Sequence, residues 1–169
     1  MDKKSLIIIT ILLAWAIGAT TTTVIYYNEF QKYYEKYQNL TQKTIMRVSF
    51  GINYGNGTLV WYNDTPVING STVYEALLLI ADVNATTTPF GVYVRGINGV
   101  NDDPTHAWLY AINRNDSSVN AWFSVNGWYY PGVGADSLTL KNGDIVVWIF
   151  LNWVEHYPPP DPTTRENVR

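Results

Sequence analysis

The sequence contains no cysteine, and this absence removes several classes of site at once. Disulfide bonds, thiolate zinc sites, cysteine nucleophiles and cysteine-ligated iron–sulfur clusters are all excluded. Histidine is also scarce, with 2 residues in a chain of 169, which leaves little material for a histidine-based metal site. We therefore expect neither a metal site nor a bound cofactor.

Charged residues are also few: they make up 15% of the chain, and the net charge is -3. A nucleic-acid partner would favour a clustered basic face, so we expect no nucleic-acid binding. The hydrophobic fraction of 47% is too high for a disordered polar chain. The aromatic fraction of 15%, with 7 Trp and 13 Tyr, indicates a stable binding or structural module rather than an enzyme.

A long apolar run lies near the N-terminus, at residues 6–19, and only Thr10 interrupts it. Taken as one helical span, residues 5–27 extend about 34 Å, which is enough to cross a bilayer. Lys3 and Lys4 precede the run and should stay in the cytoplasm. The sequence thus predicts a single-pass signal-anchor over residues 1–27 in the cell membrane, with the rest of the chain extracytoplasmic.

A cleaved signal peptide is the alternative interpretation of the same segment. Its apolar region would be residues 6–17, and Gly18 and Ala19 are small enough for a signal peptidase. We favour the uncleaved anchor because the helical pattern continues without a polar, flexible stretch. Both interpretations export the rest of the chain.

The helical pattern continues through a predicted stalk at residues 28–45. A solvated spacer is one interpretation of this stalk, and a parallel coiled coil that makes the protein a weak homo-oligomer is the other. A glycan at Asn39 would limit how closely the helices approach at that end. Residues spaced alternately by three and four form the seam: Tyr26, Phe30, Tyr33, Tyr37, Leu40 and Thr44.

Six Asn-x-Ser/Thr sequons lie beyond the apolar segment, and none has proline in the middle position. N-glycosylation needs an exposed site on the exported side, so sequons and predicted topology agree. The alternative is that these residue types simply favour turns. We expect a glycosylated outer surface, with sugar on several of Asn39, Asn56, Asn63, Asn69, Asn84 and Asn115.

From residue 46 the hydrophobic period changes, which predicts an α+β domain over residues 46–155. Residues 48–52 and 58–62 read as a hairpin. A capping box of Thr72 and Glu75 should start a helix whose apolar face extends to Val83. Residues 156–169 are rich in proline, cannot pack regularly and should form a flexible tail. The other expected strands are residues 90–97, 107–112, 119–125, 137–140 and 144–151.

Five short motifs occur in the order of a known family, over about residues 48–153. They resemble the transcobalamin-like C-terminal domain family, found in microbial surface proteins of unassigned role. The resemblance implies a β-grasp-like fold, often tethered to the cell envelope. In the vitamin carriers a related domain helps to enclose cobalamin, but no ligand residue carries over to this chain. The motifs are Ser71-Thr-Val-Tyr-Glu-Ala-Leu-Leu, Gly96-Ile-Asn-Gly-Val100, Trp108-Leu-Tyr110, Gly134-Ala135 and Leu140-Lys-Asn-Gly-Asp-Ile-Val-Val-Trp148.

The aromatic stretch Trp128, Tyr129 and Tyr130 is the candidate binding site, because it precedes Pro131 and Gly132 in a predicted loop. Three adjacent large rings in such a loop cannot all point inward. An exposed cluster would contact sugar, a partner protein or a flat cofactor. The alternative is a loop that folds back over the core. Trp108 and Trp148, in contrast, lie within strand patterns and are expected in the core.

Catalytic constellations are poor, so we expect no enzyme activity. The adjacent carboxylates Asp102 and Asp103 lie in a predicted turn without the spaced ligand series of a calcium site. The favoured function is a membrane-anchored binding or scaffolding module, with the membrane and other surface proteins or glycans as partners. A structural subunit of a surface layer or filament, or an exported polysaccharide-acting enzyme, is the alternative.

Overall fold

The computed structural model describes residues 2–89 and 91–165; for Leu6, Thr10 and residues 38–43 it describes the backbone alone. The chain divides into two compact units, Met1–Lys43 and Thr44–Arg169.

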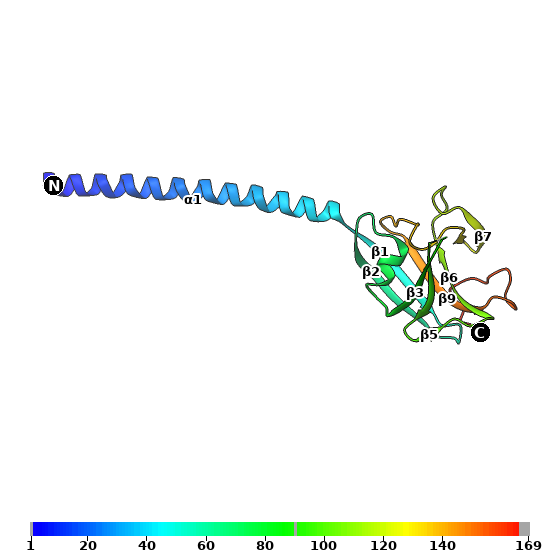
Figure 1. The fold of residues 1–169 in the computed structure, drawn as a ribbon. Helices are drawn as coiled ribbons and strands as arrows, with labels where there is room; N and C mark the ends of the chain where they lie inside the picture. Colours follow the sequence, from blue (N-terminus) through cyan, green and yellow to red (C-terminus); the bar gives the residue numbers. More distant parts are fainter. Residues whose placement is uncertain (1, 90, 166–169) are drawn as a thin grey trace. The chain divides into compact units, whose positions relative to one another are not determined.

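The first unit is a single helix, which continues into the first residue of the second unit: α1 covers Lys3–Thr44 (Figure 1). The four consecutive threonines fit this helix because their hydroxyls donate to carbonyls one turn earlier, as in Thr20 Oγ1 to Ala16 O at 2.9 Å. The predicted continuation from the apolar segment into the stalk is therefore confirmed. The helix is long and apolar enough to cross a membrane, and none of its apolar window is buried.

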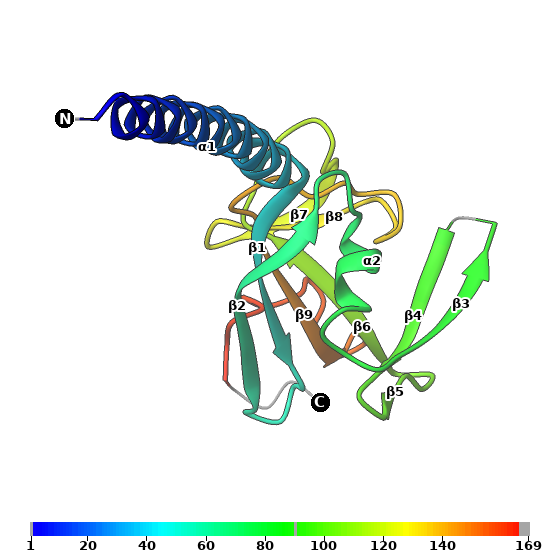
Figure 2. The same ribbon diagram turned by 90° about the vertical axis from the view of Figure 1, so that its left-hand side faces the viewer.

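The second unit contains a six-stranded mixed sheet with the strand order β2-β1-β9-β6-β8-β7 (Figure 2). The neighbours β1 and β9 are parallel, and every other neighbouring pair of this sheet is antiparallel. The predicted hairpin is confirmed as β1 and β2. The bounds are β1 Ile45–Asn53, β2 Leu59–Ile68, β6 His106–Ile112, β7 Ala121–Val125, β8 Trp128–Pro131 and β9 Ile145–Asn152.

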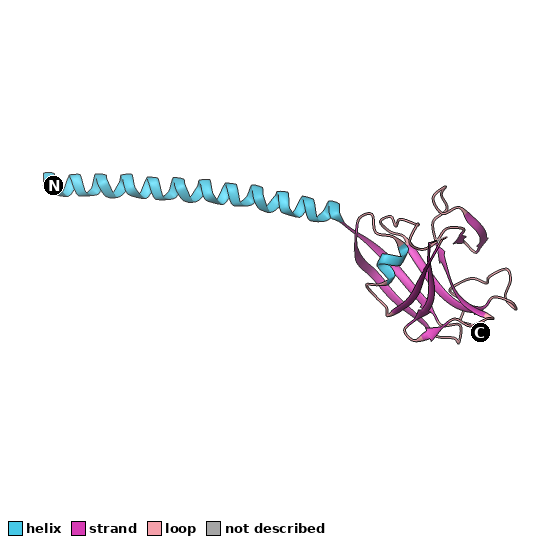
Figure 3. Ribbon diagram, viewed as in Figure 1, coloured by secondary structure: helices cyan, strands magenta, loops and turns pink. Residues whose placement is uncertain are grey.

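A short helix and a second, three-stranded sheet complete this unit (Figure 3). The capping box predicted at the helix start is present: Thr72 Oγ1 accepts from Glu75 N, and Glu75 Oε2 accepts from Thr72 N. The second sheet has the order β3-β4-β5. The bounds are α2 Val73–Leu77, β3 Val83–Thr88, β4 Gly91–Ile97 and β5 Val100–Asn101.

The hydrophobic core of this unit has two parts. The larger cluster collects buried residues from β1, β6 and β9 together with α2 and β4, and it includes Trp108 and Trp148 as predicted. The smaller cluster comprises Ala111, Tyr130, Ile149 and Leu151, and it contains β9 residues that alternate with those of the larger cluster. Every described member of both clusters lies between Met46 and Leu151, so the chain from residue 44 onward contains its own complete core.

Three predictions of secondary structure are wrong. The helix ends at Leu77 instead of reaching Val83, and Leu78 and Leu79 are exposed. Residues 83–88 form β3, whose residues Asn84 and Thr86–Thr88 pair with β4. The hydrophobic pattern of the sequence did not indicate this strand. Residues 137–140 contribute only the isolated bridge between Thr72 and Thr139.

The tail predicted from residue 156 has no helix or strand among its described residues, but it makes hydrogen bonds with the domain. The buried Asn53 side chain donates from Nδ2 to the carbonyls of Pro162 and Thr164, at 2.9 and 2.6 Å. Tyr130 Oη donates to Pro160 O at 2.8 Å. Prolines forbid a regular ladder, but their carbonyls still accept hydrogen bonds from side chains. We refer to residues 153–165 as the C-terminal segment.

Candidate binding pocket

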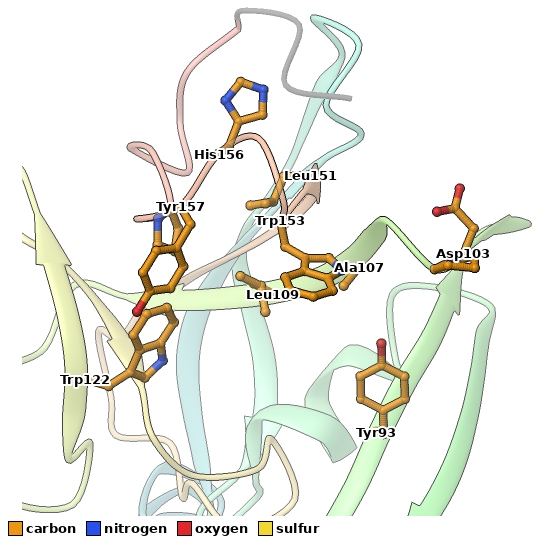
Figure 4. Close-up of a pocket in the computed structure, with 11 residues that line it drawn as sticks. Tyr93, Asp103, Ala107, Leu109, Trp122, Leu151, Trp153, His156 and Tyr157 are labelled. Carbon is orange, nitrogen blue, oxygen red and sulfur yellow. The ribbon is translucent and has the colours of Figure 1, made fainter.

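A pocket opens along one edge of β6 because its neighbour β8 leaves it early. The two strands pair only at Ile112 and Tyr129 among the described residues. Toward its start, β6 therefore has no neighbouring strand on this side, and its residues Ala107 and Leu109 line a cavity. This outer compartment has a volume of about 420 Å³ and is lined by Tyr93, Asp103, Pro104, Ala107, Leu109, Trp122, Leu151, Trp153, His156, Tyr157 and Pro159 (Figure 4).

Three large rings form an exposed aromatic wall around this compartment. Trp122, Trp153 and Tyr157 are 47%, 48% and 72% exposed. Trp122 and Tyr157 come from β7 and the C-terminal segment, and their rings lie nearly parallel, with centroids 6.0 Å apart and planes at 11°. Figure 4 shows these two rings side by side, with Trp153 nearer to Leu109. Exposed large apolar rings around a concave apolar floor are typical of a surface that binds something.

The C-terminal segment holds two of these rings in place through backbone hydrogen bonds. Trp153 N donates to Thr105 O at 3.1 Å, and His156 N donates to Asn152 O at 2.9 Å. The tethers of Asn53 and Tyr130 to Pro160, Pro162 and Thr164 fix the segment further along. The wall is therefore an ordered part of the domain, and the rings need not be ordered anew when a ligand arrives.

The polar rim of the outer compartment is built by Asp103 in the turn before β6. Its Oδ1 accepts from the backbone N–H groups of Thr105 and His106, both at 2.8 Å, and lies 2.9 Å from His106 Nδ1. The hydrogen bond with His106, followed by those from Thr105, holds the pKa of Asp103 well below its usual value. Burial and then the Asp102 carboxylate raise the pKa of Tyr93, which also lines this compartment. The rim thus carries an ionised carboxylate and a neutral phenol at neutral pH.

A smaller inner compartment of about 190 Å³ adjoins the outer one, because Tyr93, Leu109 and Trp122 line both. It lies against the face of β6 and β9 that carries Trp108, Tyr110 and Trp148. None of its described lining residues is Asp, Glu, Lys, Arg or His. The remaining lining residues are Val92, Val94, Tyr130, Pro131, Val133, Gly134 and Ala135.

Most buried polar rings around the inner compartment bond to a backbone carbonyl. Trp108 Nε1 donates to Val100 O at 2.9 Å, and Tyr110 Oη donates to Val133 O at 2.7 Å. Burial, followed by the charge of Asp136, raises the pKa of Tyr110, so this phenol stays a donor.

Trp148 differs from these rings. Its side chain is 2% exposed, yet its Nε1 has no hydrogen-bond partner among the described residues. Leaving a buried donor unpaired costs about 1–3 kcal/mol, so the exception is informative.

The predicted aromatic site lies next to this pocket and has a different structure. Trp128, Tyr129 and Tyr130 form strand β8, not a loop. Tyr130 is buried, and burial followed by the charge of Asp161 raises its pKa. Trp128 and Tyr129 are partly buried against the two core clusters. Alternation along β8 therefore places Tyr129 on the side of the larger cluster and Trp128 and Tyr130 on the side of the smaller one, and the prediction of an exposed cluster is wrong.

The rings that do form an exposed wall were not singled out from the sequence. Trp122 looked like an ordinary strand residue, and Trp153 and Tyr157 fell at the edge of the expected tail. Trp153 and Tyr157 share one signal in the sequence, because both follow the apolar strand β9. The approach of the C-terminal segment to β7, which places Tyr157 beside Trp122, is a tertiary contact without a local signature.

Five of the six predicted glycosylation sites lie at exposed positions, whereas the Asn39 side chain lies outside the described ones. The exposed asparagines are Asn56, Asn63, Asn69, Asn84 and Asn115.

Within the described residues, no group of three or more His, Asp or Glu side chains is placed to hold a metal ion. Asp102, which was weighed as a calcium ligand, is paired with Arg95 at 3.2 Å.

Two of the solved structures that are similar to this chain are described here by what they share with it. A protein from Ruminococcus gnavus, described as a candidate metal-binding protein, is 14% identical, with a TM-score of 0.46; the match covers 63% of this chain and 97% of that one. Haptocorrin in complex with Cbi is 16% identical, with a TM-score of 0.48; the match covers 63% of this chain and 25% of haptocorrin. The matched part of this chain thus corresponds to about a quarter of haptocorrin.

Comparison with curated protein sequences finds no match. A family model does match: residues 70–152, from just before α2 to the end of β9, are similar to the Domain of unknown function (DUF4430).

Proposed function

We propose that the domain after residue 44 binds a small molecule with a flat apolar face, without catalysing a reaction, and that α1 anchors it outside the cell membrane. The observation that carries this proposal is the exposed aromatic wall of Trp122, Trp153 and Tyr157 over an apolar floor. The volume of the outer compartment falls within the range of about 300–1,000 Å³ that small-molecule sites occupy. The rim of Asp103 and Tyr93 supplies the few polar groups that orient a ligand.

A fluorescent apolar probe tests the binding proposal. N-phenyl-1-naphthylamine is neutral and emits strongly only in an apolar site, so titration of residues 44–169 should give saturable binding of one probe per chain. The double variant Trp122→Ser/Trp153→Ser should lose this binding, because two of the three rings of the aromatic wall are removed. Trp61→Ser is the matched control: Trp61 is 37% exposed in β2 and does not line the pocket. Equal binding to both variants would refute the proposal.

The anchoring proposal rests on α1, whose apolar window needs a non-aqueous partner. An arginine at the centre of a membrane helix costs about 2.5–3.5 kcal/mol. The double variant Ile11→Arg/Leu12→Arg should therefore move the protein from the membrane to the soluble fraction. Lys36→Glu, outside the predicted span, should leave it in the membrane. Retention of the arginine variant in the membrane would contradict anchoring by this helix.

Glycosylation on the exported side is supported by the exposure of Asn56, Asn63, Asn69, Asn84 and Asn115. Sugar on these residues requires that the domain faces outward, so the modification reports topology as well. Intact-protein mass spectrometry of the protein from its native membrane should show masses above the bare polypeptide. The bare mass alone would remove this part of the proposal.

Weak self-association through the stalk remains a proposal, and other surface proteins or glycans are the further partners we propose. Phe30, Tyr33 and Tyr37 of the seam are exposed on α1. Cysteines placed at Phe30 and Tyr37 should cross-link in membranes more than cysteines placed at Lys32 and Glu35. Equal cross-linking of the two sets would leave the stalk a spacer.

A β-grasp-like fold is the finer classification that we propose for the α+β domain. The features that support it are the β1–β2 hairpin, the short α2 after it and the parallel pairing of β1 with β9.

A further inference from the structure

The outer compartment has a carboxylate and aromatic rings at separate places along its lining. Asp103, Trp122, Trp153 and Tyr157 all line this compartment. In the view of Figure 4, Asp103 lies well apart from Trp122 and Tyr157, and Trp153 lies between them. The Asp103 side chain is 50% exposed, and the three rings are exposed as well, so a ligand in the compartment can reach all four.

The carboxylate of Asp103 has room for a further partner. Its Oδ1 accepts from Thr105 N, Thr105 Oγ1 and His106 N, at 2.8–2.9 Å. Among the described residues, Oδ2 lies within hydrogen-bond distance of His106 Nδ1 alone, at 2.9 Å. A carboxylate oxygen can accept about two hydrogen bonds, so Oδ2 can take another donor. The hydrogen bonds to this carboxylate hold its pKa well below the usual value, so it presents a negative charge to the compartment.

The described lining of the outer compartment offers this charge no strong cation. None of its described residues is Lys or Arg. Arg95, two residues after Tyr93 on β4, already pairs with Asp102 at 3.2 Å. The nearby basic groups are the imidazoles of His106 and His156, and imidazole is ordinarily neutral at pH 8. An anionic ligand would be repelled here and would lose its hydration, whereas a cation would gain an ion pair.

The aromatic rings of the compartment favour the same sign of charge. The face of an aromatic ring carries partial negative charge and attracts a cation. The same faces are apolar, so they also hold the flat part of a ligand. A molecule with a flat apolar body and one positive group therefore matches both the rings and the carboxylate.

We propose that the ligand is an organic cation whose ammonium group lies beside Asp103 and whose flat apolar body lies against Trp122 and Trp153. This inference rests on the binding function proposed above and assigns the charge of the ligand. Asp103 is then the residue that selects a cation over a neutral molecule of the same shape, because only the cation pairs with its carboxylate.

The test compares two probes of the same shape: phenyltrimethylammonium, a permanent cation, and tert-butylbenzene, which has carbon in place of the nitrogen. Both displace N-phenyl-1-naphthylamine from residues 44–169 at pH 8, and the ratio of their affinities is measured. Asp103→Asn keeps the size of the side chain and removes its charge. The ratio should then shift about three- to fivefold against the cation, a change typical of losing one half-exposed ion pair. Asp116→Asn removes a carboxylate that does not line the pocket and should leave the ratio unchanged.

A second measurement needs no variant. In the unsubstituted protein, the methyl protons of bound phenyltrimethylammonium should show nuclear Overhauser contacts to Asp103, and its ring protons should show them to Trp122. An unchanged ratio in a folded Asp103→Asn variant, an equal shift in Asp116→Asn, or methyl contacts without Asp103 would overturn this inference and leave the binding function standing. Failure of all three probes to bind would overturn both.

Discussion

The aromatic side chains of the domain fall into two groups that differ in burial and in bonding. Trp108, Tyr110 and Tyr130 are buried, and each donates to a backbone carbonyl. Trp122, Trp153 and Tyr157 are exposed and face a cavity. The first group stabilises the fold by burying large rings without leaving polar atoms unpaired. The second group gains little from folding, which is why it indicates a surface used for binding.

The sharpest test of this difference compares one tryptophan from each group. Trp108→Ala should lower the free energy of unfolding by about 3–5 kcal/mol, because it leaves a cavity and removes the hydrogen bond to Val100 O. Trp153→Ala should change it by about 1 kcal/mol or less and should weaken probe binding instead. Urea denaturation of residues 44–169 measures the first quantity, and N-phenyl-1-naphthylamine titration the second. Equal destabilisation by the two variants would erase the distinction between the groups.

The tether of the C-terminal segment is the next largest effect, because it connects the buried region to the exposed wall. Asn53 is fully buried and donates to Pro162 O and Thr164 O. Asn53→Ala should cost about 1–3 kcal/mol of stability and should also weaken probe binding, since Trp153 and Tyr157 lose their support.

The exposed Asn56→Ala is the control for this tether and should change neither stability nor probe binding. Amide hydrogen exchange should show faster exchange in residues 153–165 of the Asn53→Ala variant. Unchanged exchange there would mean that other contacts hold the segment.

The dependence of stability on acid pH is the smallest expected effect, because it is absent at neutral pH. The hydrogen bonds of His106 and Thr105 lower the pKa of Asp103, and those of Lys141, Ser118 and Arg114 lower the pKa of Asp116. A carboxylate with a lowered pKa stabilises the fold fully above its unfolded value of about 3.9, and this contribution is lost as the pH falls toward the folded value. Thermal unfolding should therefore show a Tm that decreases below about pH 4.

Asp103→Asn and Asp116→Asn should each make this decrease shallower, because a neutral amide binds no proton in either state. Only Asp103→Asn changes the rim of the pocket, so Asp116→Asn is the variant that should alter the acid response without altering probe binding. A decrease of the same slope in both variants and in the unsubstituted protein would mean that other groups cause it.

Features with a local signature could be predicted from the sequence. The continuous helix α1 follows from an apolar run and a three-four spacing, and the capping box of Thr72 and Glu75 marks the start of α2. The carboxylate of Asp144 also has a local partner, because its Oδ2 accepts from Lys141 N, three residues earlier, at 2.8 Å. Asp144 also pairs with Arg114 at 3.1 Å, a contact across 30 positions of sequence that no local pattern encodes.

The candidate pocket could not be predicted because it depends on where strands part and where the chain returns. Its opening exists because β8 leaves β6 after one pair, and its wall exists because Tyr157 returns to Trp122. An aromatic cluster in sequence, as in Trp128, Tyr129 and Tyr130, is not an aromatic cluster in space, since alternate residues of a strand face opposite sides.

One measurement tests the central claim most directly: which tryptophans sense a bound probe. Residues 44–169 contain six of the seven tryptophans, so 5-fluorotryptophan labelling gives six ¹⁹F signals. On addition of N-phenyl-1-naphthylamine, the signals of Trp122 and Trp153 should move, and those of Trp61 and Trp128 should stay. Movement of the Trp128 signal, with Trp122 and Trp153 unchanged, would place the site at β8 and contradict the account.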